Sequence, residues 1–441
     1  MTATKAAWLR SSTFVFFATA VVNVCNFAYH LVMVRALRPE DYAALNALLA
    51  LSMIVSVPAT TIQAAISRQV AYASAQAQTP HIWQALAGTL TRVGVLSIGF
   101  LGLVAVGHRS VAAFLQMPDS ALIIWWGVVV ALLLVAPALV GALQGLQEFT
   151  HLGTNLMTGG VSRLIGGLSL VWMGYGVGGA IIGLAFSAAV TCVLAVLQLR
   201  TVQRRHGALA PGRAPVELLA ALEDWFSDLL VAVRPPWTVS GTTLVIAVAV
   251  TAYTSLTNSD VALAKHYLAP AAAGEYAVAA MISRIILFLP SAVSIVLFPK
   301  VAHATAKGED TRPLLRQMLG VTAGLSGAAA LVCLGWPAFV TQVITGAAHP
   351  GSISLVPWLA IAMVEFALAN IVLAYILAAG HLRHVAAFLV CAVLQVLGIW
   401  GWHATPQEIA LVDAAVAFLV AAYGLALCWG PRPWLTGSVP A

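Results

Sequence analysis

The chain has 441 residues, of which 61% are hydrophobic and only 8% are charged, and its mean hydropathy is +0.95. Soluble globular domains carry about 25% charged residues, so this composition excludes a water-soluble enzyme, a disordered chain and a nucleic-acid-binding protein. With a net charge of +6, the next question is which side of a membrane the basic residues occupy.

Apolar runs long enough to cross a membrane occur twelve times along the chain. A helix needs about 20 mostly apolar residues to cross about 30 Å of hydrocarbon. The first run continues past the small residues Ala18-Thr19-Ala20, which mimic a signal cleavage site, so we expect an uncleaved helix. The predicted fold is all-α and multi-pass, with spans at 11–34, 43–65, 86–107, 121–146, 150–173, 178–199, 237–258, 274–298, 314–335, 353–379, 385–402 and 408–429.

The basic residues predict how these spans are oriented. If the N-terminus is cytoplasmic and the chain alternates sides, fifteen of the 21 Lys and Arg residues fall at inner positions and four at outer ones. Cytoplasmic segments of membrane proteins carry an excess of Lys and Arg. The distribution therefore predicts a protein of the cell inner membrane with both termini in the cytoplasm.

The longest polar segment, residues 200–236, lies on the inner side in this topology. Within it, apolar residues recur at helical spacing from 218 to 233 and acidic residues take the other face, which predicts an amphipathic helix in the inner interface. It separates two predicted bundles of six helices, residues 1–199 and 237–441.

An internal repeat relates the two bundles. Each copy has a Leu-x-Pro tripeptide, a Tyr-Ala pair, a proline in the following helix and a basic residue at its end. Both copies follow an odd-numbered span and run in the same direction, which indicates a parallel repeat around a central cavity. The prolines remove one backbone hydrogen bond each, and the kinks they predict are either hinges or static bends. The corresponding residues are Tyr42 and Pro58 in residues 37–71, and Tyr276 and Pro290 in residues 268–302.

The repeat segments also resemble bacterial polysaccharide flippases. Residues 34–42 (VRALRPEDY) are similar to the start of that family's second helix, and residues 144–149 (QGLQEF) to an inner loop. Residues 260–265 (DVALAK), 274–276 (GEY) and 298–300 (FPK) are similar to segments around its eighth helix.

The resemblance implies the superfamily of multidrug, oligosaccharidyl-lipid and polysaccharide exporters, with two six-helix bundles in a V around a central cavity. It implies a transporter that is not an enzyme and needs no cofactor or metal. Its substrate would be an undecaprenyl-pyrophosphate-linked oligosaccharide, moved from the inner to the outer leaflet for lipopolysaccharide O-antigen, capsule or exopolysaccharide. The implied surroundings are membrane lipids, glycosyltransferases and a polysaccharide polymerase, around a monomer that binds no nucleic acid.

Four ionisable residues lie well inside predicted spans: Arg163, Arg284, Glu365 and Asp413. Each would cost about 2.5–3.5 kcal/mol in lipid, so all four must face protein or water. We expect the two arginines to bind the lipid pyrophosphate, because a guanidinium suits phosphate oxygens, and either acid to bind a coupling proton or sodium ion. The alternative is structural pairing of Arg with Glu or Asp.

Asn23, Asn26 and His30 share one face of the first helix, and either line the substrate cavity or hydrogen-bond to neighbouring helices. Asn258 and Asp260 are expected at the end of the seventh span. Basic residues at predicted span ends are candidates for the cavity mouths, or simply reach the interface. They are Arg35 and Lys265 on the outer side, and Arg68, Arg92 and Lys300 on the inner side.

Other functions fit the sequence less well. A cation-coupled multidrug or small-molecule exporter of the same superfamily is the main alternative, and it would need a cavity with deciding acidic charges. No outer loop is large enough for the catalytic residues of a membrane enzyme, and no phosphate-binding glycine loop is followed by Lys-Ser/Thr. The five cysteines lie in apolar runs without metal-ligand spacing, as buried small side chains do.

Overall fold

The computed structural model describes residues 2–75, 79–205, 241–290, 310–347 and 349–429, together with residues 297 and 301. These residues form helices and contain no strand, which confirms the all-α class. The helices are α1 (Thr2–Ala36), α2 (Pro39–Ala75), α3 (Thr79–Phe114), α4 (Ala121–Gly145), α5 (Phe149–Leu170), the π-helix η1 (Val171–Tyr175), α6 (Gly176–Arg205), α8 (Gly241–Leu256), α9 (Ser259–Tyr267), α10 (Pro270–Phe288), α12 (Arg312–Gly335), α13 (Pro337–Thr345), α14 (Pro350–Ala378), the 3-10 helix η2 (Leu382–His384), α15 (Val385–Gly401) and α16 (Pro406–Trp429).

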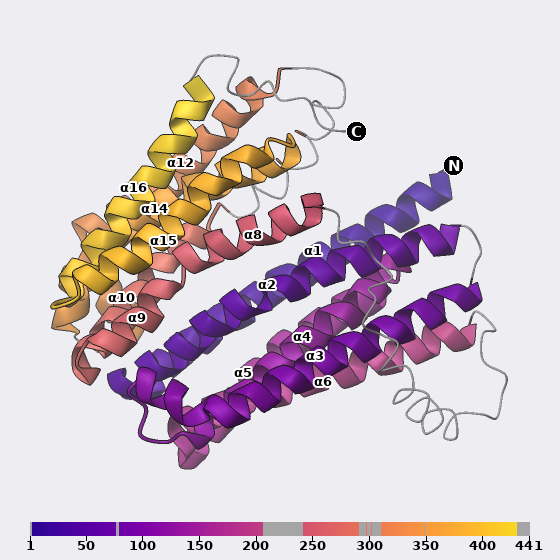
Figure 1. Cartoon of the computed structure of the whole chain (residues 1–441), viewed down its shortest axis with the longest axis horizontal. Coiled ribbons are helices and arrows are strands. Elements are labelled where there is room, and N and C mark those ends of the chain that lie inside the picture. The colour runs from indigo at the N-terminus through magenta and orange to yellow at the C-terminus, as the bar shows by residue number, and fades with distance from the viewer. Residues whose placement is uncertain are drawn as a thin grey trace. The chain divides into compact units, whose positions relative to one another are not determined.

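Ten stretches of helix are long and apolar enough to cross a membrane, and the bent pair α8 and α9 makes an eleventh. One of the ten, Phe149–Arg205, contains both α5 and α6, which lie side by side (Figure 1). The chain reverses at Gly174 and Gly176, whose φ angles are 91° and 51°. When α5 and α6 are counted separately, the described residues hold the twelve spans that the apolar runs predict.

Contacts divide the chain into two compact units, and α1 and α2 contribute to both. The switch in α2 falls between Val57 and Pro58, so the proline lies where the helix passes from one unit to the other. The predicted bundle limits at 199 and 237 stay a prediction, because the units are defined by contacts rather than by span order. The first unit holds residues 1–32, 58–113 and 117–239, and the second holds 33–57, 114–116 and 240–441.

In the first unit, α6 packs against both α4 and α5. Close approach of α5 and α6 depends on glycine. A Cβ atom built on Gly183 would lie 2.5 Å from the backbone nitrogen of Gly167, and one on Gly179 would lie 2.9 Å from the carbonyl carbon of Leu170. Small residues at these positions let the two backbones touch.

Gly183→Ala is therefore expected to destabilise the protein by about 1–3 kcal/mol, because the added methyl group must push α5 and α6 apart. The measurement is the thermal unfolding midpoint of the purified protein in detergent. Gly324→Ala in α12 is the matched control, since nothing lies within 4 Å of a Cβ atom there. Equal unfolding midpoints for the two variants would contradict this packing.

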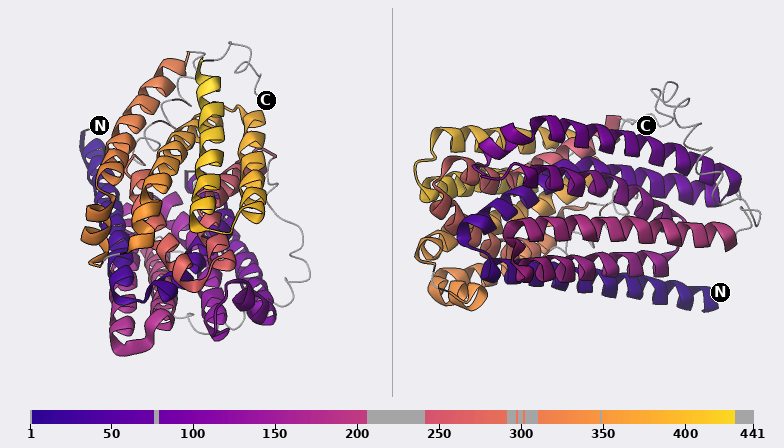
Figure 2. Two further views of the ribbon diagram at one scale, coloured as in Figure 1. Left: turned by 90° about the vertical axis from the view of Figure 1, so that its left-hand side faces the viewer. Right: turned by 90° about the horizontal axis from the view of Figure 1, so that it is seen from below.

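In the second unit, α14 is the central helix and packs against α10, α12 and α16. Figures 1 and 2 show α12, α14, α15 and α16 running alongside one another. The side of α14 that carries Leu359, Met363 and Phe366 is fully buried in this group. Glu365 therefore lies next to the core of the second unit.

Two spans differ from the sequence prediction. The seventh, expected to end at residue 258, breaks there with a bend of 45° and continues as α9. The eighth, expected over 274–298, ends as α10 at Phe288, and Pro290 lies in the turn that follows instead of inside the helix. Leu289 keeps helical backbone angles, whereas Pro290 has no N–H group to continue the helical hydrogen bonding, which explains this end. The amphipathic helix predicted at 218–233 lies outside the described residues.

Candidate functional site

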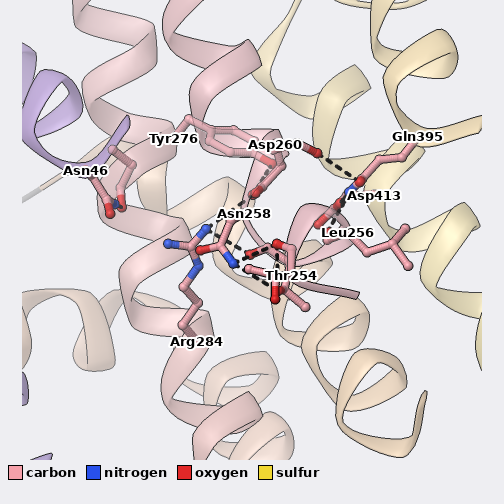
Figure 3. Close-up of polar contacts among 12 residues, drawn as sticks. Asn46, Thr254, Leu256, Asn258, Asp260, Tyr276, Arg284, Gln395 and Asp413 are labelled. Carbon is pink, nitrogen blue, oxygen red and sulfur yellow. Dashed lines mark hydrogen bonds and ion pairs between the residues drawn. The ribbon is translucent and has the colours of Figure 1, made fainter. Parts of the chain in front are cut away.

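The break between α8 and α9 is the centre of a buried polar cluster in the second unit (Figure 3). A break leaves backbone carbonyls without helical partners, and inside a membrane these must be satisfied by other groups. Arg284 of α10 donates from Nη2 to the carbonyl oxygen of Thr257 at 3.0 Å. Gln395 of α15 donates from Nε2 to the carbonyl oxygen of Leu256 at 2.8 Å. Side chains from two other helices therefore complete the broken span.

Asp260, in the first turn of α9, is fully buried at 0% exposure. Its Oδ1 atom lies 3.4 Å from Nη2 of Arg284, and its Oδ2 atom accepts a hydrogen bond from the hydroxyl of Tyr276 at 3.1 Å. The sequence predicts Glu365 or Asp413 as structural partners for an arginine. The structure instead pairs Arg284 with Asp260, which was expected only to close the seventh span.

Asp413, on α16, is also fully buried. Its Oδ1 atom accepts a hydrogen bond from Nε2 of Gln395, and Gln395 accepts one from Ser259 at 3.0 Å. The other oxygen, Oδ2, has no hydrogen-bond partner among the described residues. Only one of the two carboxyl oxygens is therefore hydrogen-bonded, and the other could bind a proton or a cation.

The cluster carries more acidic than basic charge. Asp413 interacts electrostatically with Asp260, Arg284 and Glu365, and the Oε2 atom of Glu365 is buried with no partner in the described ranges. Arg284 is paired with Asp260, whereas Asp413 and Glu365 have no cation within ion-pair distance among the described residues. Because buried charges are expensive unless they are paired, this balance favours uptake of protons or a small cation.

Arg284 also lines a cavity of about 240 Å³ in the second unit. Polar groups of α8 and the following break form one wall, with Tyr253, Thr257 and Asn258, and α14 contributes Asn370. The ionic cluster therefore borders open space and is not sealed in a packed core.

A second group of predicted residues meets in the first unit. Arg163 of α5 donates from Nη1 to Oδ1 of Asn26 on α1, at 3.1 Å. Its guanidinium carbon lies 4.6 Å from the centre of the Tyr29 ring, and His30 contacts that ring edge-on at 5.9 Å. Asn23 is exposed and takes no part in the hydrogen bonds described for this group. The structure therefore brings together three of the four residues predicted here, and it adds Tyr29.

Arg163 differs from Arg284 in its charge environment. Among the described residues, no carboxylate lies within ion-pair distance of Arg163. Its Nε atom is buried and has no hydrogen-bond partner in the same part of the chain. The first unit thus holds a partly buried positive charge that no described residue of that unit neutralises.

The predicted mouth residues have varied surroundings. Arg35 donates from Nε and Nη2 to the carbonyl oxygens of Ile344 and Val343, at 2.9 and 2.8 Å, and so caps the C-terminus of α13. Lys265 is buried at 4% exposure, with Glu40 and Asp41 as its electrostatic partners, and does not reach the interface as expected. Arg68 is exposed and Arg92 is half-buried, whereas Lys300 lies outside the described residues.

Comparison with known proteins shows what this fold is. No family model matches the sequence, and no curated protein matches it. The lipid II flippase MurJ in an inward closed conformation superposes with a TM-score of 0.66 at 11% identity, over 96% of this chain and 88% of that one.

Two MATE transporters match similarly. An inward-facing multidrug resistance MATE family transporter of the MOP superfamily gives a TM-score of 0.62 at 15% identity, over 92% of this chain and 94% of that one. A point mutant of the Vibrio cholerae MATE transporter VcmN gives 0.59 at 15% identity, over 97% of this chain and 99% of that one. At these identities the likeness shows a shared fold, that of multi-pass MATE and MurJ transporters.

Proposed function

We propose that this protein moves an undecaprenyl-pyrophosphate-linked oligosaccharide from the inner to the outer leaflet of the cell inner membrane by alternating access. The observation that carries the proposal is Arg163, a partly buried arginine whose Nε atom is buried without a hydrogen-bond partner and which has no carboxylate partner among the described residues. A guanidinium is always charged and presents its donors in a fork that matches phosphate oxygens. Burial makes this charge costly, and an anionic headgroup would satisfy it.

The fold supports a lipid as cargo. One structure of the same fold is a lipid II flippase, and two others are MATE transporters, one of them a multidrug resistance transporter. Two bundles with sites at mid-membrane depth can expose a headgroup first to one side and then to the other, while the lipid tail stays in the bilayer. Both termini would lie in the cytoplasm, as the distribution of basic residues predicts.

The acidic cluster of the second unit supports coupling to a proton or sodium gradient. Asp413, which has one oxygen without a hydrogen-bond partner among the described residues, and Glu365 would bind the coupling ion. Asp260 would remain paired with Arg284. Intramembrane carboxyl groups serve this purpose in many transporters.

Asp413→Asn is expected to reduce gradient-driven transport by more than about 10-fold, because the amide keeps the shape of the side chain but cannot take up a proton or offer a negative charge to a sodium ion. Transport into proteoliposomes would be measured with and without an imposed gradient. Asp119→Asn, at an exposed carboxylate before α4, is the control for the same chemical change. A D413N protein that still responds fully to the gradient would exclude Asp413 from coupling.

A cation-coupled multidrug or small-molecule exporter is the alternative, and the excess of buried carboxyl groups in the second unit would also suit a cationic ligand. A cellular test separates the two. In a polysaccharide-producing host, deletion of the gene is expected to trap lipid-linked repeat units on the inner leaflet, and the wild-type gene should release them. Unaltered surface glycan after deletion, together with new sensitivity to cationic drugs, would favour the exporter.

A further inference from the structure

We propose that Tyr29 is a positioning residue which, together with Asn26, orients the Arg163 guanidinium to receive two oxygen atoms of a phosphate-type anion. The inference rests on the proposed function, because it specifies how the first unit would hold the anionic headgroup. The residues involved all lie in the first unit: Asn26 and Tyr29 on α1, Arg163 on α5 and Ala180, through its carbonyl group, on α6.

Tyr29 is fixed from both ends. The ring is fully buried at 0% exposure, and its hydroxyl donates to the carbonyl oxygen of Ala180 at 3.3 Å. The guanidinium carbon of Arg163 lies over the ring, 4.6 Å from its centre, which is well within the range of a cation–π interaction. The ring therefore holds the plane of the guanidinium without contributing a negative charge.

Asn26 determines which edge of the guanidinium stays free. Its Oδ1 atom accepts the hydrogen bond from Nη1 at 3.1 Å, so the Nη1 end of Arg163 is occupied. A guanidinium can bind an oxyanion bidentately through Nε and Nη2, and Nε has no partner among the described residues. The residue as a whole is only partly buried. Because Nε is covered in this conformation, a phosphate would contact Nη2 first, and it would bind the Nε–Nη2 edge once neighbouring side chains move aside.

The neutral character of Asn26 and Tyr29 gives the site its selectivity. Arg284, in the second unit, has Asp260 as an ion-pair partner. Asn26 and Tyr29 instead fix the orientation of the Arg163 guanidinium and leave its charge uncompensated. A carboxylate at position 26 would occupy the same Nη1 contact and cancel that charge. The arrangement therefore favours an anion, with either a lipid pyrophosphate or free pyrophosphate as its source.

The test measures binding of two probes, inorganic pyrophosphate and farnesyl pyrophosphate, to the full purified chain by calorimetry in detergent. Asn26→Asp is expected to weaken binding of the anion about 10-fold or more, with an unfolding midpoint no lower than that of wild type, since the new carboxylate pairs with Arg163. Tyr29→Leu is expected to weaken binding about 10-fold, and Tyr29→Phe, which keeps the ring, should restore it to within about 3-fold of wild type. Tyr175→Leu, at an exposed tyrosine, is the matched control.

In the transport assay, the same variants should raise the KM for the lipid and leave the maximal rate largely intact, which loss of folding would not do. Unchanged pyrophosphate affinity in both N26D and Y29L, or a wild-type protein that binds neither probe, would overturn the inference. If the wild type binds pyrophosphate with these variant effects but moves no lipid, the anion site stands and the proposed function fails. If farnesyl pyrophosphate binds more tightly than the free ion, the source is the lipid headgroup, and the reverse order assigns a free phosphate compound.

Discussion

Arg284→Ala is expected to reduce the amount of folded protein sharply, by about 3–5 kcal/mol of stability, because it leaves Asp260 buried without its cation. Asp260 is 0% exposed, and its remaining hydrogen bonds, from Tyr276 and from the backbone at Val261, cannot replace a full positive charge. The substitution also frees the carbonyl oxygen of Thr257 at the break between α8 and α9. Expression level and thermal unfolding midpoint in detergent are the measurements.

The double variant R284A/D260N separates pairing from substrate binding. Removal of the carboxylate charge together with the guanidinium is expected to restore most of the lost stability, since no unpaired charge then remains. If R284A is as stable as wild type but inactive in transport, Arg284 contacts the substrate and is not held in a structural pair. The two arginines predicted from the sequence would then have the same role.

Arg163→Ala has the opposite expected profile. Transport should fall by about 100-fold or more, because a bidentate charged contact to the headgroup is lost, and this corresponds to about 2.7 kcal/mol. Stability should not fall, since the substitution removes a buried charge without orphaning a carboxylate among the described residues. Transport rate and unfolding midpoint would be measured on the same preparation.

Arg163→Lys serves as the control, because it keeps the charge but not the planar fork. It is expected to recover only part of the transport rate. An R163A protein that unfolds at a much lower temperature and is still active when folded would show that Arg163 is structural.

The helical architecture was predictable because lipid imposes a simple requirement on the sequence. Every span needs a long apolar run, and such runs are visible without knowledge of contacts. The close packing of α5 and α6 depends on Gly167, Gly179 and Gly183, small residues that are likewise visible in the sequence. The predicted limits were wrong for the spans that contain breaks. The sequence Thr257-Asn258-Ser259 does not exclude a helix, so the bend at this point depends on the tertiary contacts of Arg284 and Gln395.

The residues of the candidate site were predictable as a set but not as pairs. Arg163, Arg284, Glu365 and Asp413 were indicated by the cost of charge in a membrane. The pairing of Arg284 with Asp260 was not, because Asp260 was placed at the end of a span that in fact continues beyond it. Gln395, a polar residue inside the eleventh span, was a signal that the same cost argument could have used. The sequence around Tyr29 gave no sign of a site, since a tyrosine in an apolar helix is most often part of the packed core.

These observations divide the charge between the two units. The first holds a partly buried guanidinium next to neutral groups, and the second holds the pair of Arg284 and Asp260 together with two further carboxyl groups, Glu365 and Asp413, that have an oxygen without a partner among the described residues. A binding site for an anion in one unit and for protons or a cation in the other is the arrangement that coupled export of an anionic lipid requires. Neither half would serve this purpose alone.

The most direct test is the movement of a fluorescent isoprenoid-pyrophosphate disaccharide between leaflets of proteoliposomes that contain the purified protein, followed by quenching of the outward-facing probe. The account predicts rapid movement with wild type, none above empty vesicles with R163A, and no movement of a cationic dye by either protein. Transport of the cationic dye without movement of the anionic lipid would contradict it.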